Sequence, residues 1–166
     1  FYSSPHLIHL AERYRINGKV VEEERLDSAA EVVRPVVEEM RAEGKAPTYF
    51  EMTTALALVL FEREKPDFVV WETGLGGRLD ATNVVLPVLS IITGISLEHT
   101  EYLGSTLAAI AREKAGIIKD AVPVLCGPLK PEALEVIRKV AAERGAPLTV
   151  VPPYEGEFHL LRLPGG

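Results

Sequence analysis

Short apolar runs alternate along the chain with longer stretches in which apolar residues recur three and four positions apart. The short runs have the length of strands buried on both faces. The longer stretches have the spacing of amphipathic helices. We therefore predict strands at FVVW (68–71), VLSIIT (88–93), VPVLC (122–126) and PLTVV (147–151).

The helical spacing predicts four helices, and their ends carry recognisable signals. The fourth begins with Pro131 and ends at Gly145, which are the residues that helix termini prefer. Pro35 lies inside the first and should break or kink it. The predicted helices occupy residues 22–43, 48–65, 106–118 and 131–145.

Alternation of strands and helices in the second half predicts an α/β fold with a largely parallel sheet flanked by helices. The length of 166 residues favours a single domain. Ligands of such sheets bind beyond the carboxyl ends of the strands. The loops that leave those ends are ETGLGG (72–77), GISLEH (94–99) and GPLK (127–130).

Composition narrows the classes of function. The net charge of −6 disfavours sequence-independent binding to nucleic acid, whose phosphates require an excess of Lys and Arg. Cys126 is the only cysteine, which excludes an intramolecular disulfide framework. The sequence shows neither a signal peptide nor a membrane span, so we predict a cytoplasmic protein without a membrane partner.

The stretch WETGLGGRLDATN (71–83) raises the question of nucleotide binding. Gly74 and Gly76 supply two glycines of a dinucleotide fingerprint, but Leu79 takes the third position. The phosphate-binding P-loop is absent, because neither Gly18-Lys19 nor Gly44-Lys45 is followed by Ser or Thr. Any ATP chemistry needs a phosphate cradle from outside these residues.

Three ionisable residues mark the predicted strand ends. Glu72 follows the FVVW run, His99 lies in the next loop, and Lys114 follows in the next predicted helix. Lys114 is within reach of the same edge if that helix packs back over the sheet. A carboxylate and an imidazole at neighbouring strand ends suit Mg²⁺, with Mn²⁺ as the alternative that the imidazole favours. Purely structural roles stay open: a salt-bridged acid, a helix-capping or otherwise satisfied loop histidine, and a solvated lysine. His6 and His9 form a weaker rival metal pair.

Five motifs together resemble the central domain of folylpolyglutamate synthase, a relative of the Mur ligases. The resemblance runs in order from residue 1 to about residue 150. The GRLDATN form is similar to that of bifunctional bacterial members, which are also dihydrofolate synthases. The motifs are YSSPHL (2–7), TYFEMTTALAL (48–58), ETGLGGRLDATNVV (72–85), EHTEYLG (98–104) and IAREKAGI (110–117).

The resemblance implies an ATP-dependent amide ligase of folate biosynthesis and one-carbon metabolism. In that family ATP phosphorylates a carboxylate of dihydropteroate or a folate, and the amino group of L-glutamate attacks the acyl phosphate. Such phosphoryl transfer is catalysed mainly by positioning and charge neutralisation, which makes Mg²⁺ the implied cofactor.

The resemblance also implies roles for individual residues. Ser4, Glu72 and His99 match metal-ligand positions. Lys114 matches a lysine that is carbamylated in many members, and a carbamate would ligate or orient a second Mg²⁺. Glu72, His99 and Lys114 are thereby the implied catalytic residues. The glycines near Glu72 would give the substrate close access to the backbone.

A second implied set contacts the pterin of dihydropteroate. Core packing is the alternative for the two aromatic residues of this set. Capping of the turn together with Asn83 is the alternative for its aspartate. The set comprises Thr48, Tyr49, Phe50, Glu51, Leu79, Asp80 and Ala81.

The family pattern extends beyond this chain. Its P-loop would precede Phe1, an ATP-binding helix would follow LLRLPGG (160–166), and a C-terminal glutamate-binding domain would come later. Residues 1–166 therefore resemble a partial central domain, which we expect to be inactive alone. Glu98 replaces a common aspartate and Thr73 a frequent valine, and neither is an implied ligand. Another Mur-type ligase, a non-catalytic pterin- or metal-binding module, and a purely structural α/β domain are the alternatives.

Overall fold

The computed structural model describes residues 1–153, so the closing LLRLPGG segment lies outside the described residues. The chain divides into two compact units, which are described separately. Unit 1 comprises Phe1–Leu86 and Arg112–Ile117, and unit 2 comprises Pro87–Ala111 and Ile118–Gly166. The division falls within one helix, α4.

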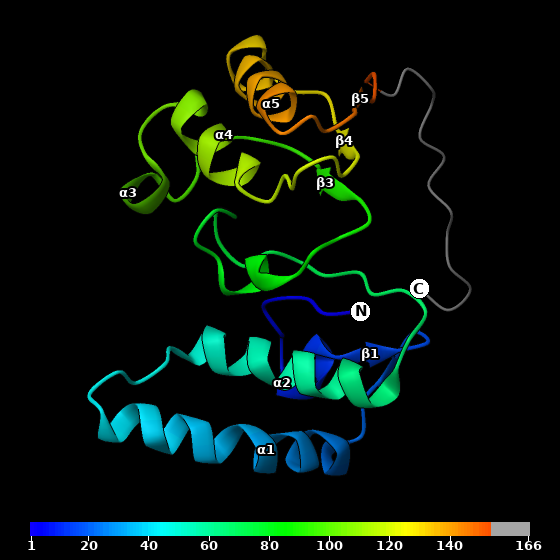
Figure 1. Cartoon of the computed structure of the whole chain (residues 1–166), viewed down its shortest axis with the longest axis vertical. Helices are drawn as coiled ribbons and strands as arrows, with labels where there is room; N and C mark the ends of the chain where they lie inside the picture. Colours follow the sequence, from blue (N-terminus) through cyan, green and yellow to red (C-terminus); the bar gives the residue numbers. More distant parts are fainter. Residues whose placement is uncertain (154–166) are drawn as a thin grey trace. The chain divides into compact units, whose positions relative to one another are not determined.

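Unit 1 is built around two long helices that lie side by side (Figure 1). Two short antiparallel strands, β1 and β2, pair Arg15 with Val20 and Ile16 with Lys19. The elements of unit 1 are the 3₁₀ helix η1 (Leu10–Arg13), β1 (Arg15–Ile16), β2 (Lys19–Val20), α1 (Glu23–Ala42), α2 (Tyr49–Glu64) and the 3₁₀ helix η2 (Ala81–Val84).

Both long helices lie where the sequence predicts them, and α2 has well-defined ends. Thr48 caps its N-terminus, and Lys65 closes its C-terminus in the left-handed conformation, with φ of 46°. Helix α1 runs through Pro35 without interruption, so a break at Pro35 is wrong, while a kink there stays a prediction. Proline removes a single hydrogen bond from this 20-residue helix, and the remaining turns maintain it.

Aromatic residues form the core of unit 1. The ring of Tyr2 lies 4.9 Å from that of Trp71 and 5.6 Å from that of Tyr14, measured between centroids. Tyr2 and Tyr14 are fully buried, and Leu60 of α2 is 2% exposed. The N-terminal residues are thereby packed against α2.

The predicted strand at FVVW is wrong in the described residues. Tyr2 forms a parallel bridge with Trp71, in which the Tyr2 amide donates to Val70 O at 2.9 Å and the Glu72 amide donates to Tyr2 O at 3.1 Å. Phe68 is 83% exposed and Val70 64%. A strand is buried on both faces only when neighbouring strands and helices cover it, and here the pairing extends over a single residue.

Unit 2 contains a parallel sheet, which confirms the predicted α/β class. The strands have the order β3-β4-β5, and Ser90 pairs with Val124, which pairs with Leu148. Helix α5 and the beginning of α4 lie beside this sheet (Figure 1). The elements are β3 (Ser90–Ile92), α3 (Thr100–Leu103), α4 (Leu107–Ala115), β4 (Val124–Cys126), α5 (Pro131–Glu143) and β5 (Leu148–Val150). The residues of α4 from Arg112 onward belong to unit 1.

The core of unit 2 joins the sheet to its helices. Ile137 of α5 and Cys126 of β4 are fully inaccessible, and Val124 is 1% exposed. Along α5, Ala133, Ile137 and Ala141 are buried at intervals of four residues, which is the apolar stripe of an amphipathic helix. This packing holds the carboxyl ends of the strands, where ligands of parallel sheets bind.

Candidate functional site

The glycine-rich turn after Trp71 is packed against residues of unit 1. A Cβ atom at Gly74 would lie 2.4 Å from Cζ of Phe50, and one at Gly77 would lie 3.0 Å from the carbonyl oxygen of Glu113. Gly77 also has φ of +157°, which disfavours other residues. The space that a side chain would fill at these two glycines is therefore occupied by the Phe50 ring and by the backbone of α4. Close access of a substrate to the backbone here stays a prediction.

Asp80 organises the same turn. Its Oδ2 accepts a hydrogen bond from the Leu75 amide at 2.7 Å, and its Oδ1 accepts from the Thr82 amide at 3.0 Å and from the Thr82 hydroxyl. The Asn83 amide donates to Asp80 O at 2.9 Å. The turn-capping role is therefore confirmed, while a contact between Asp80 and pterin stays a prediction. Leu79, one residue earlier, is 80% exposed.

Two of the implied metal ligands are brought together. The amide of Ser4 donates to Oε2 of Glu72 at 2.8 Å, so the two residues are neighbours although 68 positions separate them. The bridge between Tyr2 and Trp71 causes this proximity, because it aligns the two segments in parallel. An exposed carboxylate thus lies beside the serine at the end of the FVVW segment.

His99 and Lys114 belong to different units. His99 is exposed in unit 2, at the N-cap position of α3, with φ of 48°. Its carbonyl oxygen accepts hydrogen bonds from the amides of Tyr102 and Leu103 at 2.9 Å, whereas its side chain makes no capping hydrogen bond, so the predicted cap is present only through the backbone. Lys114 is half-buried in the last turn of α4, within the segment assigned to unit 1. The convergence of Glu72 with His99 stays a prediction.

The implied pterin residues at the start of α2 differ from one another in burial. Phe50 is half-buried and packs on the aromatic core, with its centroid 6.4 Å from that of Tyr2, which confirms core packing for this residue. Tyr49 is 53% exposed, so core packing is wrong for Tyr49. The guanidinium carbon of Arg13 lies 5.7 Å from the centre of the Tyr49 ring, a cation–π distance.

Thr48 and Glu51 form a reciprocal cap at the same helix end. Oε2 of Glu51 accepts from the Thr48 amide at 2.7 Å and from its hydroxyl at 2.8 Å, while the Glu51 amide donates to Oγ1 of Thr48 at 3.2 Å. The hydrogen bond from the Thr48 amide, followed by that from its hydroxyl, lowers the pKa of Glu51. Both residues therefore have a structural role that does not require a ligand.

One imidazole of the rival histidine pair is already engaged by a protein group. Nδ1 of His6 accepts a hydrogen bond from Nε of the buried Arg13 at 2.8 Å, which opposes metal binding at that nitrogen. His9 is exposed, and its amide donates to Oε1 of Glu12 at 2.8 Å. No group of three or more His, Cys, Asp and Glu side chains suited to a metal ion occurs within residues 1–153.

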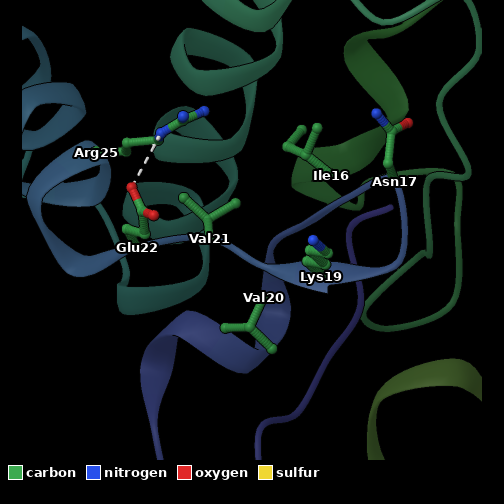
Figure 2. A pocket seen from close by; sticks show the side chains of 7 residues that line it. All are labelled: Ile16, Asn17, Lys19, Val20, Val21, Glu22 and Arg25. Carbon is green, nitrogen blue, oxygen red and sulfur yellow. Dashed lines mark ion pairs between the residues drawn. The ribbon is translucent and has the colours of Figure 1, made fainter.

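A pocket of about 280 Å³ lies elsewhere in unit 1, at the β1–β2 turn and the start of α1. Figure 2 shows the residues that line it, including the ion pair in which Nε of Arg25 lies 3.6 Å from Oε2 of Glu22. None of the candidate site residues lines it. The same residues, 1–153, contain no helix long and apolar enough to cross a bilayer.

Sequence reasoning missed Arg78, although it quoted the motif that contains it. The guanidinium of Arg78 forms an ion pair with Glu113 at 3.0 Å. The separation of 35 positions carries no local signal, and only the packing of the turn on the end of α4 reveals the pair.

Comparisons with known proteins identify close relatives, although no protein-family model matches the chain. The chain is 45% identical over 148 residues to dihydrofolate synthase/folylpolyglutamate synthase of Bacillus subtilis, covering 88% of this chain and 34% of that protein. It is 43% identical over 145 residues to the Escherichia coli protein of the same name, covering 87% and 33%. The chain therefore spans about a third of the length of these relatives.

Solved structures show the same similarity in three dimensions. The apo form of L. casei FPGS superimposes with a TM-score of 0.85 at 36% identity, over 90% of this chain and 37% of that chain. An FPGS–AMPPCP–folate complex gives 0.85 at 37% identity with the same coverage. E. coli FolC in complex with DHPP and ADP gives 0.80 at 41% identity, over 90% and 34%.

Proposed function

The chain belongs by homology to the folylpolyglutamate synthase/dihydrofolate synthase family, as one segment of it, and on this premise we propose that it is part of an ATP-dependent ligase that joins L-glutamate to dihydropteroate or a folate. The observation that carries the proposal is sequence identity of 45% together with a shared fold over 90% of the chain. The complexes of relatives with AMPPCP and folate, and with DHPP and ADP, support these ligand classes.

We propose Ser4, Glu72 and His99 as ligands of a magnesium ion, with Lys114, as a carbamate, beside a second one. A hydroxyl, a carboxylate and an imidazole form a donor set that suits Mg²⁺ or Mn²⁺. The hydrogen bond from the Ser4 amide to Glu72 supports this assignment, because it brings two of the donors together. The bound cation would neutralise phosphate charge during transfer.

The chain's own residues bind and orient the acceptor. The exposed Tyr49 ring offers a stacking surface for a pterin, and the neighbouring Arg13 strengthens that surface electrostatically. Leu79 and Ala81, on the turn that Asp80 closes, present a second, preorganised surface. Thr48, Phe50 and Glu51 act mainly by fixing the end of α2 that displays Tyr49.

The decisive test is an assay of the complete protein that contains this segment. Labelled L-glutamate is supplied with ATP and Mg²⁺, with dihydropteroate as acceptor in one reaction and a reduced folate in another. We expect glutamate to be incorporated with release of ADP, and neither product to form without the acceptor. Hydrolysis of ATP without incorporation into either acceptor would refute the ligase assignment.

Residues 1–166 alone should not support turnover, because they contain no P-loop motif. The same assay on this segment, with the complete protein as positive control, is expected to yield no labelled product. Product above the level without enzyme would contradict this proposal. A cytoplasmic location, where ATP and L-glutamate are available, forms part of the same proposal.

A further inference from the structure

The glycine-rich turn is fastened to the last turn of α4 by both backbone and side chains. The amide of Arg78 donates to Glu113 O at 2.8 Å. Its guanidinium donates hydrogen bonds to the Glu113 carboxylate through two nitrogens. Nε lies 3.2 Å from both carboxylate oxygens, and Nη2 lies 3.0 Å from Oε1. Paired donors of this kind fix the orientation of both planes as well as the distance between them.

Asn83 closes the other side of the contact. Its Nδ2 donates to the carbonyl oxygens of Arg78 and Gly116, at 3.1 Å in each case. One amide thus joins the turn to the residues that follow α4. All the residues involved belong to unit 1.

The two backbones are in van der Waals contact at this point. A Cβ atom at Gly116 would lie 2.3 Å from both Cα and Cβ of Arg78, and one at Gly77 would lie 3.1 Å from Lys114 O. Such distances leave no room for a side chain, so the spacing between the turn and Lys114 is fixed by direct contact.

Fixing Glu113 also fixes the direction of its neighbour. Successive residues of an α-helix point about 100° apart around its axis. A helix that is held through both the carbonyl and the carboxylate of Glu113 cannot rotate without breaking the pair, so the direction in which the Cα–Cβ bond of Lys114 leaves the helix is set as well. The same turn carries Leu79, Asp80 and Ala81.

We propose that four residues form a latch, which positions Lys114 relative to the glycine-rich turn that carries Leu79, Asp80 and Ala81. The latch comprises Arg78, Asn83, Glu113 and Gly116. The four are positioning residues, since they act through Lys114 and the turn. The proposal rests on the ligase function proposed above. It assigns a role in catalysis to residues that contact one another and are not proposed to contact the substrate.

The test compares Arg78→Met with Arg144→Met in the complete enzyme. Arg144 is the matched control, because it pairs with Asp120 at 2.9 Å and its side chain has the same 52% exposure as that of Arg78. We expect Arg78→Met to lower kcat on the order of 10- to 100-fold, the scale of an angstrom-level misplacement. The KM for ATP should stay within about twofold in both variants, since none of the four residues is a proposed ligand of a phosphate or of the metal.

Two further measurements separate positioning from stability. Hydrogen exchange should become faster in peptides covering 75–83 and 112–117 of Arg78→Met, while the melting temperature stays close to that of Arg144→Met. Arg78→Lys, which keeps the charge with one donor group, should recover part of the lost kcat. Asn83→Asp, which turns an oxygen towards two carbonyls, should reproduce the loss without removing the ion pair.

Each outcome bears on one of the two proposals. A wild-type enzyme that fails to ligate glutamate refutes the proposed function and, with it, the positioning role. An active wild type in which Arg78→Met and Asn83→Asp have the kcat of Arg144→Met refutes the latch alone. Unchanged hydrogen exchange in both segments also refutes the latch. A loss of kcat accompanied by a proportional fall in melting temperature refutes it too, because lost stability would then explain the lost activity.

Discussion

The hydroxyl of Tyr2 links the N-terminal segment to α2 inside the core of unit 1. It lies 3.2 Å from Oγ1 of Thr53 and 3.2 Å from Oγ1 of Thr54, both of which are buried. Buried hydroxyls are costly when they lack a partner. The Thr53 hydroxyl also donates to Phe50 O at 3.0 Å, so the Thr54 hydroxyl depends more on the link to Tyr2. This link holds the segment that carries Ser4 in place beside Glu72.

Tyr2→Phe should lower the free energy of unfolding by about 1–3 kcal/mol, because two buried threonine hydroxyls lose a partner. Urea denaturation followed by circular dichroism measures the change. Tyr102→Phe is the control, since Tyr102 is 75% exposed. Equal stability of the two variants would show that the Tyr2 hydroxyl does not contribute.

Tyr14 should make stability depend on alkaline pH. Burial, with a smaller contribution from Tyr2, raises the pKa of Tyr14 well above its ordinary value of 10.0. The folded state therefore releases this proton at higher pH than the unfolded state does. The stabilisation is complete below about pH 10 and is lost progressively as the pH rises towards the folded-state pKa.

Urea titrations between about pH 9 and pH 11 test this dependence, which spans the ordinary range of tyrosine titration. The free energy of unfolding of the wild type should fall more steeply with pH than that of Tyr14→Phe. Parallel curves would mean that Tyr14 titrates normally in the folded state. Tyr14→Phe also loses the hydrogen bond to Thr53 O at 3.0 Å, which offsets the two curves at every pH.

At the level of single residues, the sequence indicated which residues are candidates for the site better than it indicated which residues contact one another. Glu72 and Ser4 were named separately from their motifs, and their proximity appears only when Tyr2 pairs with Trp71. The ion pair between Arg78 and Glu113 could not be predicted, because its partners are far apart in the sequence and no local pattern links them. Local geometry was predictable where the partner is close in sequence, as for Asp80 and its turn.

Among the elements, α2 shows how a short sequence motif defines a helix end. Thr48 and Glu51 exchange hydrogen bonds across the first turn, whereas the corresponding residue of α1, Glu22, makes no capping hydrogen bond through its side chain. Reciprocal caps satisfy amide groups that the helix leaves without partners. The cap therefore fixes the end of α2 that carries Tyr49.

Thr48→Ala should lower the free energy of unfolding by about 1 kcal/mol, the usual cost of losing an N-cap. Glu22→Ala should have a smaller effect, which urea denaturation measures. Because hydrogen bonds from Thr48 lower the pKa of Glu51, part of the difference should disappear as the pH falls below the ordinary value of 4.5. A difference from wild type that is constant down to about pH 3 would contradict this coupling.

Helices were more predictable than strands for a physical reason. The spacing of apolar residues and the caps belong to the helix itself, which explains the agreement for α2 and α5. Burial of a strand depends on its neighbours, and FVVW lacks enough of them in the described residues. The helix does not break at Pro35, because the rest of a long helix compensates for one lost hydrogen bond.

At the scale of the whole molecule, the chain has the fold of a segment that covers about a third of its relatives' length. Large apolar side chains are exposed in both units, among them Leu79 and Leu86 in unit 1 and Val88 in unit 2. The parallel sheet and the α/β class followed from the alternation of strands and helices, which is a property of the whole pattern. The proposed ligase function needed the motifs as well, since a fold alone does not determine a reaction.

The central claim is that Glu72 and His99 bind one divalent cation. Binding of Mn²⁺ to the complete protein, measured by electron paramagnetic resonance, tests it most directly in the wild type, in Glu72→Ala and His99→Ala, and in the exposed control His9→Ala. Loss of a ligand should weaken Mn²⁺ binding on the order of tenfold or more in each of the two site variants, and the control should bind as the wild type does. Wild-type affinity in either Glu72→Ala or His99→Ala would contradict the claim.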